Sequence, residues 1–219
     1  RRVLVGGNIG VPLSAQVEAS TDETVHVVEA SSFQLETTDR FHPWLAALLN
    51  FSPDHLDRHP TVAAYGRAKQ RLFANQTAAD WTVVNAESPE ALDLARVTAA
   101  RVVRYAVDGA APGATVYAGR GFIWQRTSEG EVPLAPLAAA RLAGCHELSN
   151  VVAASAIATV AGAEPPAIER ALEGFTGLEH VMEPVATVGG VRFVNDSKAT
   201  NVDAAARSIE SYDRVVAIV

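Results

Sequence analysis

The feature that most constrains the fold is a regular alternation between short apolar runs and longer segments of helical periodicity. A polar or glycine-containing segment follows each apolar run. This pattern is typical of βα units, in which successive strands pair in parallel and helices cover the sheet. The sequence therefore predicts an α/β fold with a mostly parallel sheet. The expected strands are residues 3–5, 25–28, 45–49, 82–84 and 102–105.

The pattern changes twice further along the chain. Short runs separated by Gly and Pro in residues 109–134 predict a small antiparallel appendage. Residues 148–161 have the apolar character of a buried helix stopped by Gly162, and a second helix is expected from Pro165 to about residue 174. Two strands at 183–188 and 191–194 and a helix at 202–210 then begin a new unit. We place a domain boundary near residue 180, which divides the chain into residues 1–180 and 181–219.

Composition excludes several classes of partner. The net charge is −7 and the basic residues are scattered, which argues against binding to nucleic acid or an anionic membrane surface. The longest apolar stretch, residues 151–163, is shorter than the ~20 residues of a membrane helix. A lone Cys145 excludes an intrachain disulfide and is compatible with a reducing cytoplasm. Because both ends run into apolar segments and no initiator Met is present, we expect an internal fragment of a longer protein.

The chain has sixteen arginines but only two lysines, Lys69 and Lys198. An ammonium can lose its proton, whereas a guanidinium effectively cannot. Each lysine lies in a cluster of polar residues, which makes both candidates for chemistry.

Lys69 belongs to a helix predicted from Pro60, which suits a first helical turn, to Phe73. The spacing places Lys69 on the same apolar face as Tyr65. Burial would lower the pKa of Lys69 and raise its neutral, nucleophilic fraction. A neutral amine can react with carbon dioxide to give a carbamate, an oxygen ligand suited to Mg2+. Alternatively, the ammonium reaches water along its methylene stem.

Ligands of open α/β sheets collect beyond the carboxyl ends of the strands, here residues 6–10, 29–36 and 50–59. Glu29 ends a predicted strand, like the metal-holding acid of phosphoryl-transfer enzymes; alternatively, it caps the next helix. Residues 6–10 offer backbone N–H groups but lack the dinucleotide-binding glycine spacing. The alternative there is a tight turn in which Asn8 tolerates an unusual backbone.

His55 and His59 are four residues apart, a spacing that would suit a zinc pair on a helix. However, Pro60 disfavours helical geometry at His59, and no third nitrogen or sulfur ligand stands nearby. Mg2+ or substrate binding therefore fits the Asp54-His55 loop better than zinc. A hydrogen-bonded loop histidine is the other interpretation.

The second lysine lies in the polar loop 195–201, between a predicted strand and a helix for which Asn201 is a suitable N-cap. Backbone N–H groups at a helix N-terminus attract anions, so with Lys198 they could hold phosphate or carboxylate. A capped turn without a ligand is the alternative.

Five segments together resemble the Mur ligase family over essentially the whole chain. They are Gly7-Asn8-Ile9-Gly10, Glu29-Ala30-Ser31-Ser32-Phe33-Gln34-Leu35-Glu36, Asp54-His55-Leu56-Asp57-Arg58, residues 65–69, and Asn195-Asp196-Ser197-Lys198-Ala199-Thr200-Asn201. The second and fifth resemble the member that joins D-glutamate to UDP-N-acetylmuramoyl-L-alanine.

The resemblance implies a cytoplasmic, monomeric, ATP-dependent amide ligase of peptidoglycan precursor synthesis. Residues 1–180 would be its central ATPase domain, and residues 181–219 the start of a Rossmann-like α/β C-terminal domain. A folylpolyglutamate-synthase-like ligase is the alternative within the superfamily.

The resemblance also implies residue roles. Glu29 would hold one Mg2+, and His55 and a carbamylated Lys69 a second; Lys198 would join His55 and Lys69 in catalysis. The implied substrate and nucleotide contacts are Asn8, Ser31, Gln34 and His55 for the muramoyl substrate, Asn150 for adenine, Asp196 for ribose, Lys198 for phosphate, and Thr200 for D-glutamate and the nucleotide side.

The sequence departs from the family pattern at three places. The phosphate-binding loop ending in Gly-Lys-Ser/Thr is absent, so we expect it upstream of Arg1 and expect the fragment alone not to hydrolyse ATP. Glu147 stands where the family usually has Asn, and Val181 where it usually has a nucleotide-contacting Arg. These changes motivate a further alternative, a nucleotide-binding protein that has lost catalysis.

Overall fold

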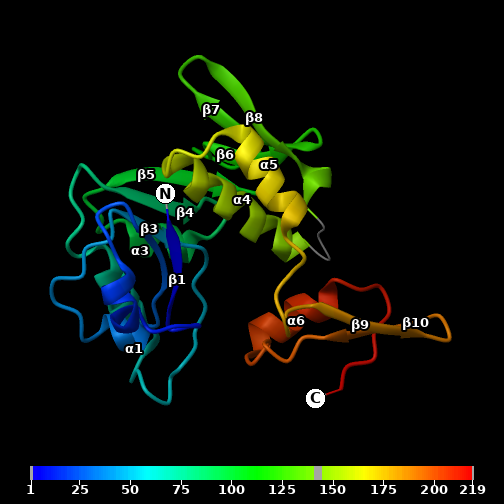
Figure 1. Ribbon diagram of the computed structural model, residues 1–219. Coiled ribbons are helices and arrows are strands. Elements are labelled where there is room, and N and C mark those ends of the chain that lie inside the picture. Colours follow the sequence, from blue (N-terminus) through cyan, green and yellow to red (C-terminus); the bar gives the residue numbers. More distant parts are fainter. Residues whose placement is uncertain (1, 141–144, 219) are drawn as a thin grey trace.

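The computed structural model describes residues 2–140 and 145–218, with a six-stranded sheet at its centre (Figure 1). Four strands are parallel, in spatial order β3 (Leu45–Leu48), β4 (Trp81–Asn85), β5 (Arg101–Ala106) and β6 (Val116–Gly119). The sheet continues through antiparallel β7 (Phe122–Thr127) and β8 (Gly130–Pro136). The predicted parallel strands are confirmed. The antiparallel segment is joined to them through β6, so it extends the main sheet.

The sheet is covered by helices on both faces. Neighbouring residues of a strand point to opposite faces, and Val83 and Val84 are each fully buried in a different apolar cluster. Val83 lies in the cluster that includes residues of α4 (Cys145–Val160) and α5 (Pro165–Gly174). Val84 lies in the cluster that includes α3 (Pro89–Ala95) and Phe73, which follows α2 (Val62–Gln70). Because such a strand is buried on both faces, its sequence is a continuous apolar run and not an alternation of apolar and polar residues.

A separate parallel pair precedes this sheet. It consists of β1 (Val3–Gly7) and β2 (Val25–Glu29), connected by the 3-10 helix η1 (Leu13–Ala19). Gln16 is buried there; its amide donates to the carbonyls of Val5 and Val11 at 3.1 Å each, and its Oε1 lies 3.0 Å from Nδ1 of His26. Buried polar groups require such partners, so Gln16 fixes the path of the chain after β1.

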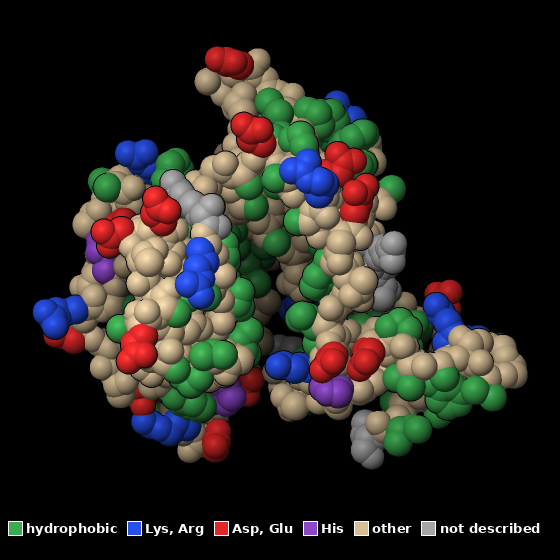
Figure 2. Space-filling model, in the orientation of Figure 1, with side chains coloured by type: hydrophobic (Ala, Val, Ile, Leu, Met, Phe, Trp, Pro, Cys, Tyr) green, Lys and Arg blue, Asp and Glu red, His purple; other side chains and the backbone are tan. Residues whose placement is uncertain are grey.

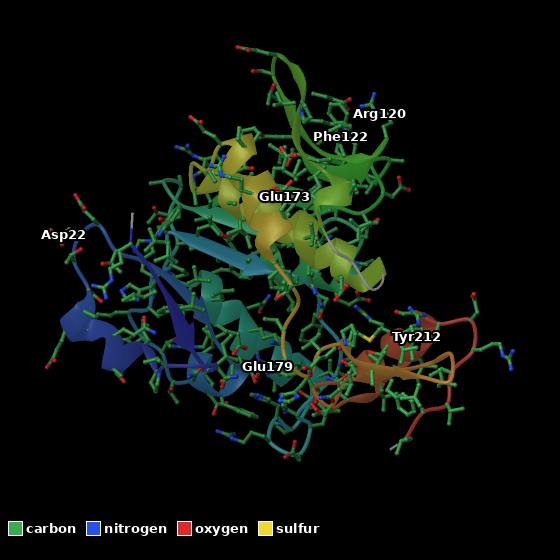
Figure 3. All side chains as sticks on the ribbon, turned by 45° about the vertical axis from the view of Figure 1, so that its right-hand side comes forward. Asp22, Arg120, Phe122, Glu173, Glu179 and Tyr212 are labelled. Carbon is green, nitrogen blue, oxygen red and sulfur yellow. The ribbon has the colours of Figure 1, made fainter. Side chains whose placement is uncertain are left out.

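The last unit contains an antiparallel hairpin and one helix, linked to α5 by the segment that carries Glu179 (Figures 1 and 3). The hairpin pairs β9 (Glu183–Val188) with β10 (Val191–Asn195), and the helix is α6 (Val202–Glu210). Arg192 of β10 lies over the ring of Tyr212, 5.6 Å from its centroid, which ties the segment after α6 to the hairpin. The predicted strands and helix are confirmed.

Other predictions need correction or fall outside the described residues. Thr61 is the N-cap of α2, so Pro60 precedes the helix and does not occupy its first turn. Val62, whose spacing also predicts a place on the apolar face with Tyr65, is exposed. The helix α3 was not predicted. The Ala-rich stretch 134–143 lies partly outside the described residues, as does the side chain of Cys145. The remaining short elements are α1 (Ser32–Leu35), η2 (Arg71–Phe73) and η3 (Leu137–Ala139). None of the helices in the described ranges has the length and apolarity needed to cross a bilayer.

Candidate active site at the carboxyl ends of the strands

The loop after β1 is packed against the end of β2. Gly7 has a φ of 111° and Gly10 a φ of 62°, whereas Asn8 is not among the residues of positive φ. The interpretation that Asn8 supplies the unusual backbone is therefore wrong; the two glycines do so. The Asn8 N–H donates to the carbonyl of Glu29 at 2.8 Å, which places Asn8 beside the candidate metal-holding acid.

The segment after β2 forms a capping box. Ser31 Oγ accepts from the Gln34 N–H at 3.2 Å, and Gln34 Oε1 accepts from the Ser31 N–H at 3.0 Å. The cap of α1 is thus Ser31, and the interpretation of Glu29 as the cap is wrong. Glu29 is left exposed at the strand end.

The loop after β3 holds His55 in an uncommon backbone conformation. Its φ is 55°, a left-handed value that costs energy for any residue with a Cβ. Three hydrogen bonds fix it: the N–H groups of Arg58 and His59 donate to the His55 carbonyl at 3.0 and 2.9 Å, and the His55 N–H donates to Asp54 Oδ1 at 2.7 Å. The His55 side chain is 45% exposed, so the loop presents its imidazole to solvent.

His59 has a different role. It is 3% exposed, and its Nε2 lies 3.0 Å from Ser32 Oγ. One ring nitrogen is therefore engaged with α1, and the structure gives the zinc-pair hypothesis no support. Among the described residues, no group of three or more His, Cys, Asp and Glu side chains is arranged to hold a metal.

Aromatic contacts join these loops to α2. The Phe33 ring lies 4.9 Å from the His55 ring and 5.6 Å from the His59 ring, centroid to centroid. The Tyr65 ring lies 6.0 and 5.3 Å from the same two histidines. No sequence pattern predicted that Phe33 would join this cluster, because its partners are distant along the chain.

Lys69 lies on α2 next to the cluster, with Nζ 5.0 Å from the centroid of the Tyr65 ring. Burial lowers the pKa of Lys69, and the carboxylates of Glu29 and Asp54 act in the opposite direction. The predicted desolvation of Lys69 is therefore confirmed, whereas carbamylation stays a prediction. Because the charges of Glu29 and Asp54 act on the Lys69 pKa, both carboxylates lie near the amine.

A second group of candidate residues lines a pocket of about 480 Å³ between the main sheet and the last unit. Figure 2 shows the surface hollowed beside the unit of β9, β10 and α6. Asn150, Val181, Asp196 and Lys198 all line this pocket. Their roles toward a nucleotide stay predictions. Thr200 is exposed and is not among the lining residues.

Hydrogen bonds hold the polar groups of this pocket in place. Asp196 Oδ1 accepts from the Met182 N–H at 3.0 Å, and the Ser208 hydroxyl donates to Oδ2. Asn201 is the N-cap of α6, as predicted, because its Oδ1 accepts from the Ala204 N–H at 2.9 Å. The Asn201 amide also donates to Asp54 Oδ2 at 3.2 Å. This last bond connects the pocket with the group around Lys69.

Several lining residues were missed by the sequence analysis. They are Asn85, Glu87, Ser88 and Glu90, which end or follow β4, and Arg207 and Ser208 on α6. The strand-end rule could have identified the first four, because β4 was among the predicted strands. Nothing local marks Arg207, since its place depends on how α6 faces the sheet.

Comparisons with known proteins agree with this geometry. The profile of the Mur ligase middle domain matches residues 5–158. A protein of Koribacter versatilis named UDP-N-acetylmuramoylalanine--D-glutamate ligase is 39% identical over 219 residues, which is 100% of this chain and 48% of that protein. One of the same name from Acidobacterium capsulatum is 43% identical over 97% of this chain and 46% of its own length. The chain thus spans about half the length of these curated relatives.

Solved structures show the same fold. A crystal structure of MurF from Acinetobacter baumannii has a TM-score of 0.70 at 17% identity and covers 97% of this chain and 49% of that one. A mutant of L. casei FPGS has a TM-score of 0.58 at 16% identity, covering 85% of this chain and 46% of that one. The profile match and the curated relatives establish that the chain belongs to the Mur ligase family, with residues 5–158 matching its middle domain.

Proposed function

We propose that the full-length protein containing this chain joins D-glutamate to UDP-N-acetylmuramoyl-L-alanine at the expense of ATP. One observation carries the proposal: relatives named for this reaction match the chain over 97–100% of its length at about 40% identity. The site is compatible with it, because Glu29 and Asp54 lie near the Lys69 amine and Asn150, Asp196 and Lys198 line one pocket. We also propose that residues 1–180 are the ATPase domain and residues 181–219 the start of the C-terminal domain. We expect the enzyme to act as a cytoplasmic monomer.

The donor set around Lys69 fits Mg2+. This ion prefers oxygen ligands and commonly takes only one or two carboxylates, completing its shell with water and substrate phosphates. Glu29 and Asp54 both lie near the Lys69 amine. In the proposed enzyme Glu29 would hold one ion, and His55 with a carbamylated Lys69 would hold the second. When bound, the two ions would offset the repulsion between ATP and the carboxylate to be phosphorylated.

The reaction would proceed in two steps. The L-alanyl carboxylate takes the γ-phosphoryl group of ATP, giving an acyl phosphate and ADP. The amine of D-glutamate then attacks the acyl carbon, and the tetrahedral intermediate expels inorganic phosphate as the amide forms. Asn8, Ser31 and Gln34 would line the muramoyl substrate, and Thr200 the D-glutamate.

The nucleotide would occupy the pocket between the two units. Asn150 would face the adenine, Asp196 the ribose and Lys198 the phosphates. The two hydrogen bonds on the Asp196 carboxylate hold it against its own unit, so its position does not depend on the ligand. Lys198 would act by keeping its charge, unlike Lys69.

The test uses the purified full-length protein with UDP-N-acetylmuramoyl-L-alanine, ATP, Mg2+ and isotopically labelled D-glutamate. We expect one labelled amide product and one phosphate released per turnover. Nucleotide binding without any amide product would contradict the proposal and favour a protein that has lost catalysis.

A further inference from the structure

Two cationic side chains line the pocket between the two units, and neither forms an ion pair with another described residue. Lys198 precedes α6 and Arg207 lies in its last turn, and both residues line the pocket. Among the described residues, no carboxylate lies within ion-pairing distance of either side chain, although eight other ion pairs involving Arg or His are formed. Cationic side chains without an ion-pair partner among the described residues leave their N–H donors available to the oxygens of an anionic ligand.

The acids of the same pocket are engaged elsewhere. Glu87 accepts from the N–H groups of Val107 and Asp108 at 2.8 and 2.9 Å. Glu90 accepts from Ser88 Oγ at 3.4 Å, and Asp196 is bonded to Met182 and Ser208. Neighbouring donors thus hold these three carboxylates in place, and none of the three forms an ion pair with Lys198 or Arg207.

Position 181 contributes no cation to the pocket. Val181 lines the pocket and offers neither charge nor side-chain hydrogen-bond donor to a ligand there. Without Arg207, Lys198 would be the only cation among the described lining residues. A guanidinium offers a rigid fork of donors that matches the oxygens of a phosphate or carboxylate, which an ammonium does not.

We propose that Arg207 and Lys198 form an anion-binding pair in this pocket, and that Arg207 binds a phosphate group of the nucleotide. The inference rests on the proposed function, because that reaction brings ATP to the pocket. A carboxylate of the amino-acid substrate has the same recognition chemistry, and the experiment separates these two sources.

The experiment compares full-length wild-type protein with Arg207→Ala, Arg207→Lys and Arg170→Ala. Arg170 is an exposed arginine on α5, away from the pocket, so its removal controls for the loss of one positive charge. ADP binding is measured by titration calorimetry without other substrates. The KM values for ATP and D-glutamate and the thermal unfolding temperature are measured on the same samples.

We expect Arg207→Ala to weaken ADP binding and raise the KM for ATP by roughly tenfold or more, the effect of one charged hydrogen-bonded contact. Arg207→Lys should recover only part of the affinity, because it keeps the charge but loses the fork. Arg170→Ala should match wild type. A rise confined to the KM for D-glutamate would keep the anion-binding pair and identify the carboxylate as its ligand.

Two results would overturn the inference. One is unchanged ADP affinity and unchanged KM values in an Arg207→Ala protein that is active. The other is a loss of affinity that accompanies a lower unfolding temperature and is fully restored by Arg207→Lys, since any cation suits the end of a helix. If wild type forms no amide product, the proposed function fails, while ADP titration still tests Arg207.

Discussion

Replacing Gly6 by Ala should disrupt the loop that carries Asn8. A Cβ at Gly6 would lie 2.0 Å from the Val11 carbonyl oxygen and 2.3 Å from Gln16 Nε2. The first neighbour is backbone, so the chain itself must move. Three hydrogen bonds share these atoms: the Gly7 N–H donates to the Val11 carbonyl at 3.0 Å, and the Gln16 amide donates to Val5 and Val11 at 3.1 Å each.

Each such bond contributes about 1 kcal/mol net, so losing two or three should cost about 2–3 kcal/mol. For a unit of this chain's 219 residues, the unfolding transition should shift down by about 4–12 °C. Because Asn8 lies two residues further along the same loop, the KM for the muramoyl substrate should rise as well. The assay is thermal unfolding of the full-length protein followed by circular dichroism.

Gly174→Ala is the matched control, because a Cβ at Gly174 would meet no atom within 4 Å and the φ of Gly174 is not left-handed. That variant should unfold at or slightly above the wild-type temperature, since Ala lowers the entropy of the unfolded chain. The packing argument is refuted if Gly6→Ala unfolds within about 1 °C of this control.

Three further predictions concern Lys69, the N-cap of α6 and the hydrogen-bonded pair of His42 and Asp80. Lys69→Arg keeps the positive charge but cannot form a carbamate, so both it and Lys69→Ala should lose activity, and short carboxylates should partly rescue only the Ala variant. An active Arg variant would show that a positive charge at this position suffices and would contradict the carbamate. Asn201→Asp should keep the cap of α6 but place a carboxylate against Asp54, so KM values should rise while the unfolding temperature stays within about 1 °C of wild type. Asn201→Ala removes the cap and should lose about 1 kcal/mol of stability. The hydrogen bond from His42, followed by that from Thr77, lowers the pKa of Asp80 to about 2. The ionised carboxylate therefore stabilises the fold at neutral pH, and this stabilisation is lost as the pH falls from about 4 through 2. His42→Ala should therefore unfold at a higher pH in an acid titration; coincident titrations would contradict the assignment.

The parallel strands β1 to β5 were predictable because each is a short apolar run bounded by polar residues. The parallel pairing of β6 with β5 was not, because β6 lies in the stretch predicted to be an antiparallel appendage. The split of the strands into two sheets was not, because an apolar run does not specify which strand lies beside it. β1 and β2 pair only with each other among the described strands, although their sequences resemble that of β3.

The candidate site was predictable where function follows directly on a strand, as at Glu29 and His55. The sequence could not show that His59 is buried, because its hydrogen-bond partner Ser32 lies 27 residues away. Arg207 escaped notice for the same reason: on α6 it resembles an ordinary surface arginine, and only the packing of α6 against the sheet brings it to the pocket that Lys198 lines.

The most direct test of the proposed function is the amino-acid selectivity of the full-length enzyme. The kcat/KM for amide formation is measured with D-glutamate, L-lysine and meso-diaminopimelate on UDP-N-acetylmuramoyl-L-alanine, and with L-glutamate on a folate acceptor. We predict ATP-dependent product with D-glutamate alone. Product formation with any of the other amino acids, or on the folate, would contradict the proposed function.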